Sequence, residues 1–227
     1  MNRELLDGIV SYRKMLLKLS EEDPQFLINE LYGIRGEVGQ RVKNLFLELE
    51  ESEKMKGISK GKILERISDE LFLSTQMYNN KLNIRDSSNE IDVLVDLNNI
   101  GQIESEILPD IMKNNKQIII ECKNYNKKIG VTWIGKFHSL LRNRNKNFGI
   151  ILSYYPLAGK GEWDSAKGLV KKIYLKDSIA IINICKDDIN KIVKNGKCIV
   201  HIIEEKYNEL VYQTDIEGYI SKHPAEK

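Results

Sequence analysis

At residues 117–124 the chain reads Gln117-Ile118-Ile119-Ile120-Glu121-Cys122-Lys123-Asn124. Three consecutive isoleucines are typical of a strand that is buried on both faces. The strand ends in a carboxylate and an amine two residues apart, and side chains at positions i and i+2 of a strand project from the same face. Glu121 and Lys123 are therefore predicted to project together into one site, since charges at the end of a buried strand are costly unless they serve a function.

A second segment of the same character lies upstream and reads Glu90-Ile91-Asp92-Val93-Leu94-Val95-Asp96. If this segment forms a strand beside the first, the Asp92 carboxylate can approach Glu121 closely enough for both to bind one divalent cation. Carboxylate oxygens are hard ligands, which favour Mg²⁺ or Mn²⁺. Farther upstream, residues 62–71 have the apolar spacing of a helix, and Glu65 on that helix could face the same cluster.

This order of elements resembles the PD-(D/E)XK nuclease superfamily and, within it, the Mrr-like restriction endonucleases. The family pattern is a helix with an acidic residue, a strand with Asp, a strand ending in Glu-x-Lys, a helix and another strand. In this chain the pattern is carried, in order, by Glu65, Asp92, Glu121-Cys122-Lys123, the helix after Gly130 and the strand Phe148–Ser153. The resemblance covers residues 58 to 200 and implies an α/β fold with a restriction-endonuclease-like central mixed sheet flanked by helices.

The chain departs from the family pattern in three places. Ile91 precedes Asp92 where the superfamily name has Pro, and an inserted segment at residues 103–113 separates the two strands. Lys136 and His138 stand on the helix where some Mrr-like sequences carry glutamine. Because the acidic residues and the lysine are all present, these departures concern the substrate and the subfamily more than the chemistry.

The resemblance implies a Mg²⁺-dependent endodeoxyribonuclease of restriction or defence type, in which Mn²⁺ can substitute. Asp92 and Glu121 would hold the cation, with the backbone carbonyl of Cys122 as a further ligand and Glu65 beside them. Lys123 would orient or help to deprotonate the attacking water and would offset phosphate charge, because negative charge develops in the transition state. The sequence does not give the direction in which the pKa of Lys123 is shifted.

A later stretch has the same local form and shows that one motif alone is weak. It reads Cys198-Ile199-Val200-His201-Ile202-Ile203-Glu204-Glu205-Lys206. Only residues 117–123 follow an acid-bearing helix and an Asp-headed strand, so the copy at Glu204 is not expected to function. A chance occurrence in a chain rich in charged residues is the alternative for either copy.

Two basic segments are candidates for contact with phosphate. Lys127 and Lys128 follow the Glu-x-Lys strand, and Arg142, Arg144 and Lys146 follow the next helix. Lysine and arginine neutralise phosphates, so DNA is the expected partner, although an ordinary solvated loop is the alternative for each segment.

The chain has no GxxxxGK[ST] loop and no His and Cys spacing typical of zinc. A separate specificity or motor subunit would therefore have to drive any translocation.

The composition limits the class of protein. The chain has 227 residues, 41% of them hydrophobic, which is enough for one sizeable domain with a buried core. The net charge is only +2, so overall basicity gives no argument for nucleic acid.

Cys122, Cys185 and Cys198 are too scattered for a disulfide framework and are expected to be buried thiols. The first residues lack a signal peptide, and no apolar run is long enough to span a bilayer, so a cytoplasmic protein without membrane contact is expected.

The N-terminal quarter lies outside the resemblance. Residues 1–57 are expected to form a helical segment for dimerisation or partner contact, and residues 58–227 the nuclease-like domain. An apolar stripe from Leu27 to Leu49 could pack against another helix, the nuclease domain or a second copy. A duplex break normally requires two sites, so we expect a homodimer that pairs through this stripe. Gly33, Gly36 and Gly39 lie within this helical stretch, where glycine is unfavourable. They predict either a break in the helix near Gly33 to Gly36 or close packing of another helix against it.

The connecting segments are predicted from their turn-forming residues. Residues 79–83 and 85–89 are polar and are expected to be loops. One helix is expected from Thr132, as the N-cap, to Arg142, and another near Glu162–Tyr174. Alternating strands and helices are expected to continue to residue 213.

Two other functions fit the same residues. Structure-selective nucleases for junctions or damaged DNA, including Holliday-junction resolvases, share this kind of site. A nucleic-acid-binding or assembly protein that keeps the fold without turnover is the rival from another class, and the set Asp92, Glu121 and Lys123 argues against it. The recognition site, any dependence on modified bases, the choice between DNA and RNA and the identity of a partner subunit do not follow from the sequence.

Overall fold

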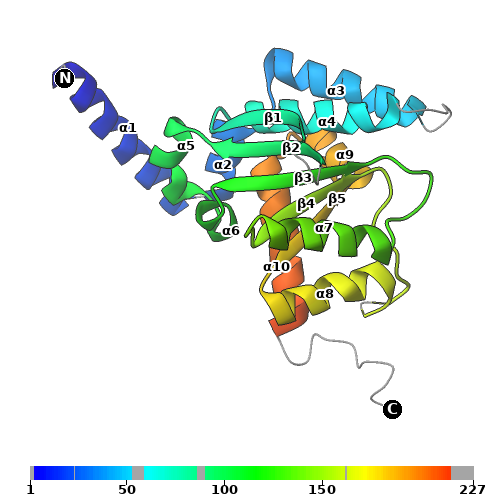
Figure 1. Ribbon diagram of the computed structural model, residues 1–227. Coiled ribbons are helices and arrows are strands. Elements are labelled where there is room, and N and C mark those ends of the chain that lie inside the picture. The colour runs from blue at the N-terminus through cyan, green and yellow to red at the C-terminus, as the bar shows by residue number, and fades with distance from the viewer. Residues whose placement is uncertain (1–2, 23, 53–58, 86–89, 162, 216–227) are drawn as a thin grey trace.

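The structure is a computed structural model that describes residues 3–22, 24–52, 59–85, 90–161 and 163–215. These residues form a five-stranded sheet with helices on both faces (Figure 1). The strands are β1 (Tyr78–Arg85), β2 (Glu90–Leu97), β3 (Gln117–Lys123), β4 (Phe148–Ser153) and β5 (Ala180–Cys185). The helices are α1 (Arg3–Glu22), α2 (Pro24–Tyr32), α3 (Gly36–Glu51), α4 (Ser59–Leu73), α5 (Asn99–Ile103), the 3-10 helix η2 (Ser105–Ile107), α6 (Asp110–Asn114), α7 (Val131–Asn143), α8 (Ser165–Asp177), α9 (Lys186–Asn195) and α10 (Ile199–Asp215).

The sheet is mixed and has the strand order β1-β2-β3-β4-β5. β2 runs antiparallel to both β1 and β3, whereas β3, β4 and β5 run parallel. Parallel neighbours need a crossover connection, which α7 provides between β3 and β4 and α8 between β4 and β5. Every residue of β4 is buried, as expected for a central strand covered on both faces. The predicted α/β class with a central mixed sheet is confirmed.

Helices α4 and α7 cover opposite faces of the sheet. α4 lies against β1, β2, β3 and β4, and α3 packs against α4. A Cβ added to Gly149 of β4 would lie 2.7 Å from a ring carbon of Phe137 and 2.8 Å from a methyl carbon of Leu141, so glycine lets α7 lie close to β4. Gly149 pairs with Ile119 of β3. Because side chains alternate along a strand, Glu121 projects toward the same face as Ile119, the face that α7 covers.

The apolar stripe predicted at Leu27–Leu49 is buried within the chain itself. In α3, the side chains of Val42, Leu45, Phe46 and Leu49 lie in the common core, and the helix contacts α4 and α9. The prediction that this stripe pairs two copies is therefore wrong, because its buried members already pack against the chain's own helices. The side chain of Leu27 lies outside the described residues.

The helix break predicted near Gly33 to Gly36 is confirmed. α2 ends at Tyr32 and α3 begins at Gly36, whose φ of +54° is a left-handed value that favours glycine. The domain boundary predicted after residue 57 falls within residues 53–58, which lie outside the described residues. On the N-terminal side of that segment, α3 shares its core with α4.

The structure differs from the predicted elements in several places. Residues 79–83 and Arg85 were expected in loops but belong to β1, an edge strand with many exposed residues. Pairing with β2 along the strand outweighs the low strand propensity of its asparagines and lysine. α7 begins at Val131 with Gly130 as its N-cap, so the predicted N-cap, Thr132, lies two residues too late. α8 spans Ser165–Asp177, so it begins and ends three residues later than the helix predicted near Glu162–Tyr174.

The cysteine prediction is confirmed. Cys122, Cys185 and Cys198 are all buried, and none forms a disulfide. Burial raises the pKa of the Cys198 thiol to about 12, so this side chain remains protonated and acts as a small apolar group. Among the helices that the structure describes, none is long and apolar enough to cross a membrane.

The packing of α3 predicts its contribution to stability. Leu49→Ala removes a side chain with no exposed surface from the core shared with α4, and we expect it to lower the free energy of unfolding by about 2–5 kcal/mol. Leu47→Ala is the matched control on the same helix, because half of Leu47 is exposed, and it should change stability by about 0.5 kcal/mol or less. Chemical denaturation measures both values. Equal, small effects would show that α3 does not belong to the core of the domain.

Candidate active site

Three charged side chains predicted from the sequence meet at the end of β3. The Lys123 Nζ atom lies 2.5 Å from Glu121 Oε1 and 3.6 Å from Asp92 Oδ2. The exposed fraction is 13% for the Lys123 side chain and 17% for each carboxylate side chain. The cluster is therefore mostly shielded from water, and each charge is compensated by an opposite charge within 4 Å.

Asp92 is positioned by the way in which β2 and β3 separate. The two strands pair from Val93 and Ile120 to Asp96 and Gln117. One residue beyond that ladder, Asp92 Oδ2 accepts a hydrogen bond of 2.7 Å from the Cys122 backbone N–H. The side chain of Asp92 thus satisfies an amide at the strand end, where the backbone ladder stops.

The same geometry orients the Cys122 carbonyl. In a strand, the N–H and the C=O of one residue point to the same side. Because the Cys122 N–H points to Asp92, its carbonyl oxygen faces the β2 side of β3 as well. The backbone carbonyl predicted as a ligand and the carboxylate of Asp92 are therefore directed to the same region.

Burial and neighbouring charge shift the pKa values of the cluster. Burial raises the pKa of Glu121, and Asp92 adds to the increase, while the Lys123 ammonium opposes both. For Lys123, burial disfavours the charged form, but the Coulombic attraction and hydrogen bond of Glu121, with the charge of Asp92, outweigh it and raise the pKa. The direction that the sequence left open is therefore upward, and Lys123 remains an ammonium in this arrangement.

The donor set fits a hard divalent cation. The hydrogen bond from the Cys122 N–H and the shortest contacts of Lys123 go to Asp92 Oδ2 and Glu121 Oε1, and each carboxylate has a second oxygen, Asp92 Oδ1 and Glu121 Oε2. These two oxygens and the Cys122 carbonyl are the ligand type that Mg²⁺ or Mn²⁺ prefers. No group of three His, Cys, Asp or Glu side chains in the described residues could hold a metal, so a backbone or water ligand would have to supplement the two carboxylates.

Glu65 lies near the cluster, but its hydrogen bond is to a residue outside the cluster. Its Oε2 atom accepts a hydrogen bond of 3.1 Å from Asn83 Nδ2 of β1. Its charge also helps to raise the pKa of the Cys122 thiol, whose side chain lies on the opposite face of β3 from Glu121. The structure therefore places Glu65 beside the strand end without an ion pair to Lys123, and its catalytic role stays a prediction.

Trp133 of α7 packs beside the cluster and was missed by the sequence analysis. The Lys123 Nζ atom lies 4.9 Å from the centroid of the Trp133 ring, and Lys136 Nζ lies 4.8 Å from it. Tyr125 stacks on Trp133 with ring centroids 5.3 Å apart and planes inclined by 28°. An ammonium is attracted to the face of an aromatic ring. Two aromatic residues close in sequence to a charged strand end were the signal that could have found this contact.

The described fold and site agree with a comparison against known protein families. The Mrr_cat family model, described as restriction endonuclease, matches residues 59–185, more than half of the chain. The chain belongs to this family. No curated protein and no solved structure matches it. The matched region begins with α4 and ends with β5, so it contains the whole sheet and all three charged residues of the cluster. The domain is therefore of the restriction-endonuclease type.

The two basic segments predicted to contact DNA lie at opposite ends of α7. Lys127 and Lys128 are exposed in the loop that directly follows Lys123. Arg142 is in the last turn of α7 and Arg144 is its C-cap, so α7, which is about 20 Å long, separates this segment from the cluster. Lys127 and Lys128 therefore follow the cluster by only four and five residues. The second segment, which includes Lys146, lies beyond the far end of α7.

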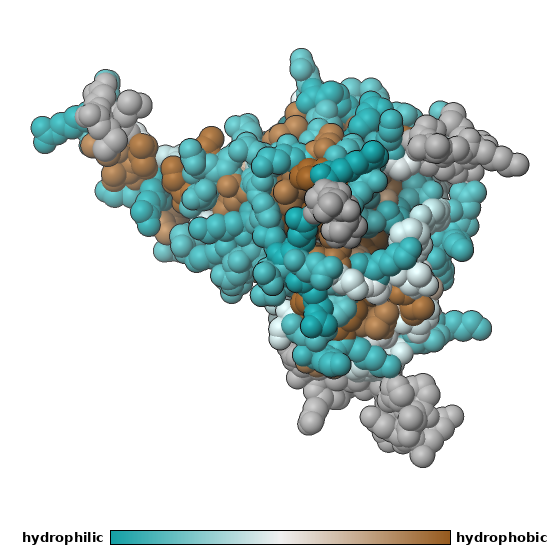
Figure 2. All heavy atoms as spheres, in the orientation of Figure 1, coloured by the Kyte–Doolittle hydropathy of each residue, from teal (hydrophilic) through white to brown (hydrophobic). Residues whose placement is uncertain are grey.

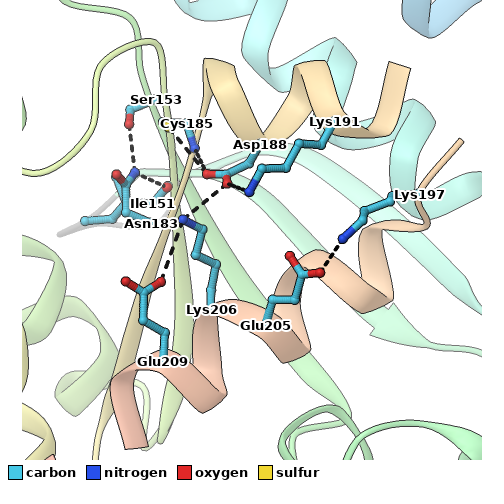
Figure 3. A network of polar contacts seen from close by, with 10 residues as sticks. All are labelled: Ile151, Ser153, Asn183, Cys185, Asp188, Lys191, Lys197, Glu205, Lys206 and Glu209. Carbon is cyan, nitrogen blue, oxygen red and sulfur yellow. Dashed lines mark hydrogen bonds and ion pairs between the residues drawn. The ribbon is translucent and has the colours of Figure 1, made fainter. Parts of the chain in front are cut away.

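The later copy of the strand-end motif is not at a strand end. Glu204 and Lys206 lie within helix α10, where residues two apart point to different sides. Figure 3 shows Lys206 directed toward Asp188 and Glu209, and its Nζ atom lies 3.2 Å from Asp188 Oδ1. Lys206 therefore joins α10 to the start of α9. Since Asp188 also accepts from the Cys185 N–H, the contact supports the end of β5.

The positions of the basic residues predict different effects on DNA binding. Replacing Lys127 and Lys128 with Ala should weaken binding to every sequence alike and reduce the slope of log affinity against log salt by about 0.9 for each lost phosphate contact. Fluorescence anisotropy at several salt concentrations measures both quantities. The triple change of Arg142, Arg144 and Lys146 to Ala is the comparison. An unchanged slope for the loop pair would show that these lysines are only solvated.

Proposed function

We propose that this chain is a Mg²⁺-dependent endodeoxyribonuclease of restriction or defence type, in which Mn²⁺ can replace Mg²⁺. The observation that carries the proposal is the cluster at the end of β3, where Lys123 lies within 4 Å of both carboxylates. Membership in the restriction endonuclease family supports DNA as the substrate. The second oxygens of the two carboxylates, together with the Cys122 carbonyl, would supply ligands of the type that the cation requires.

Each residue of the cluster has a distinct task in this proposal. Asp92, Glu121 and the Cys122 carbonyl would hold the cation, which when bound polarises the phosphoryl group and offsets negative charge. Lys123, held as an ammonium, donates hydrogen bonds to the attacking water or to a phosphate oxygen. Asp92 has a second task, because its hydrogen bond to the Cys122 N–H fixes the strand end that carries the carbonyl.

Trp133 is proposed as a positioning residue for Lys123. A lysine side chain has several rotatable bonds, and the ring limits the ammonium to the region next to Glu121. The ring also covers part of the cluster, which strengthens the electrostatic interactions by excluding water. Tyr125 stacks on the ring from the loop that follows β3.

The first test removes charge from the cluster while keeping its shape. Asp92→Asn and Glu121→Gln should abolish cleavage, because each keeps its volume but loses the charge that binds the cation. Lys123→Ala should abolish cleavage and spare metal binding. Plasmid nicking with Mg²⁺, Mn²⁺ or EDTA measures activity, and binding of Mn²⁺ to the protein measures the site without turnover.

Glu204→Gln is the matched control for these variants. It alters the carboxylate of the duplicate motif on α10 and should leave cleavage unchanged. Full activity in Glu121→Gln would contradict the assignment. A wild-type protein that binds DNA but cuts neither plasmid, methylated genomic DNA nor branched DNA would instead favour a non-catalytic binding protein, while cleavage of branched DNA alone would favour the structure-selective nuclease.

The second test concerns the aromatic contact. Trp133→Leu should lower the single-turnover cleavage rate by about 2- to 30-fold, which corresponds to the loss of one cation–π interaction. Trp133→Phe keeps a ring at this position and should recover most of the rate. Lys136→Gln is the control, because it removes the other amine from the same ring. Equal rates for Trp133→Leu and the wild type, with unchanged thermal stability, would exclude a positioning role.

A further inference from the structure

Tyr125 exposes an aromatic ring beside the cluster at the end of β3. The residue stands two positions after Lys123, in the loop that leads from β3 to α7 on the right of Figure 1. It is 37% exposed, although one side of its ring stacks on Trp133 with the ring centroids 5.3 Å apart. The exposed part of Tyr125 therefore faces away from Trp133, toward the surface next to the site.

Contacts behind Tyr125 hold its ring in place. Trp133 packs against the core of the domain, and its ring centroid lies 4.9 Å from the Lys123 Nζ atom. Tyrosine has few rotatable bonds, so a stacking contact on one side restricts the ring at a small cost in entropy. Two contacts in series, from Lys123 to Trp133 and from Trp133 to Tyr125, thus connect the exposed ring to the cluster. A planar group that stacks on Tyr125 would therefore lie beside the proposed site of cleavage.

Positive charge surrounds this ring. No Asp or Glu occurs between residues 121 and 162, whereas the same stretch contains eight lysine and arginine residues. Lys127 and Lys128 are exposed in the same loop as the ring, and Lys136 is exposed on α7. A polyanion is therefore complementary to this surface.

The surface around the ring is not a broad apolar patch. Between residues 117 and 160, all of which the structure describes, the exposed large apolar side chains are Tyr125 and Val131. Figure 2 shows hydrophilic and near-neutral residues on the side of the molecule where this loop lies. A protein partner normally requires a larger contiguous apolar patch. An aromatic ring among lysines is instead the combination that binds unpaired nucleotides.

We propose that Tyr125 stacks on a nucleobase that is unpaired or displaced from the duplex beside the scissile phosphate. The inference rests on the proposed nuclease function and adds the form of the DNA that this site accepts. Inside a duplex, the neighbouring bases cover both faces of each base, so a protein ring reaches a face only after the base has left the stack. Because every base has an aromatic face, the contact selects an exposed base and not a sequence.

A thermodynamic cycle between the ring and the base tests this contact. The probes are two otherwise identical duplexes with one bulged position, which carries adenine in one duplex and an abasic site in the other. Tyr125→Leu should weaken binding to the adenine bulge by about 5- to 150-fold, the loss expected for one base–aromatic stack, and should leave binding to the abasic bulge unchanged. Fluorescence anisotropy with the full chain in Ca²⁺ measures both affinities without cleavage.

Two variants control for the role of the ring. Tyr125→Phe keeps an aromatic ring and should bind the adenine bulge as the wild type does. Tyr212→Leu removes another exposed tyrosine, 56% exposed on α10, and should change neither affinity. An equal loss on both bulges in Tyr125→Leu would show that the ring acts only by supporting Trp133, and would overturn the inference.

A comparison with paired DNA separates this inference from the proposed function. The wild type should bind the adenine bulge more tightly than the fully paired duplex. The base analogue 2-aminopurine at the bulge should lose fluorescence on binding, because it stacks on the ring, and Tyr125→Leu should remove that quenching. Equal affinities of the wild type for bulged and paired DNA would overturn the inference and leave the proposed cleavage intact, whereas no binding to either DNA would overturn both.

Discussion

An ammonium held between two carboxylates at the end of a buried strand is the interaction on which the site depends. Less than a fifth of each of these three side chains is exposed, so a charge left without its partners would be expensive to bury. The hydrogen bond from the Cys122 N–H to Asp92 adds a geometric constraint, because it fixes the carboxylate at the point where the pairing between β2 and β3 ends. The position of each member is therefore determined by the other members.

The sheet explains why the cluster lies at a strand end. β3 has neighbours on both edges, and helices cover both faces, so its middle positions accept only apolar side chains. Polar side chains can reach water and substrate only where the strand emerges from this cover. The crossover helix α7 begins just beyond that point and brings Trp133 against Lys123. The connection required by parallel strands thus also supplies a wall of the site.

The N-terminal helices show that similar sequences can have different structural roles. Both α1 and α3 carry apolar side chains at helical spacing. α3 buries Val42, Leu45 and Leu49 in the core that it shares with α4, whereas α1 leaves Leu6, Ile9 and Val10 exposed. Amphipathic periodicity predicts that a helix will bury one side, but it does not identify the surface that covers it. That surface depends on the placement of the segments.

The sequence by itself determined the elements whose local signals are strong. The isoleucines of β3, the apolar run after Asp92 in β2 and the strand-end pair of Glu121 and Lys123 follow from residue type and charge, because neighbouring residues determine them. Only the tertiary structure decided the strand identity of β1, the helical state of Glu204 and the contact of Trp133 with Lys123. Each of these depends on residues that are distant in sequence, because pairing and burial stabilise a conformation that local propensity leaves undetermined.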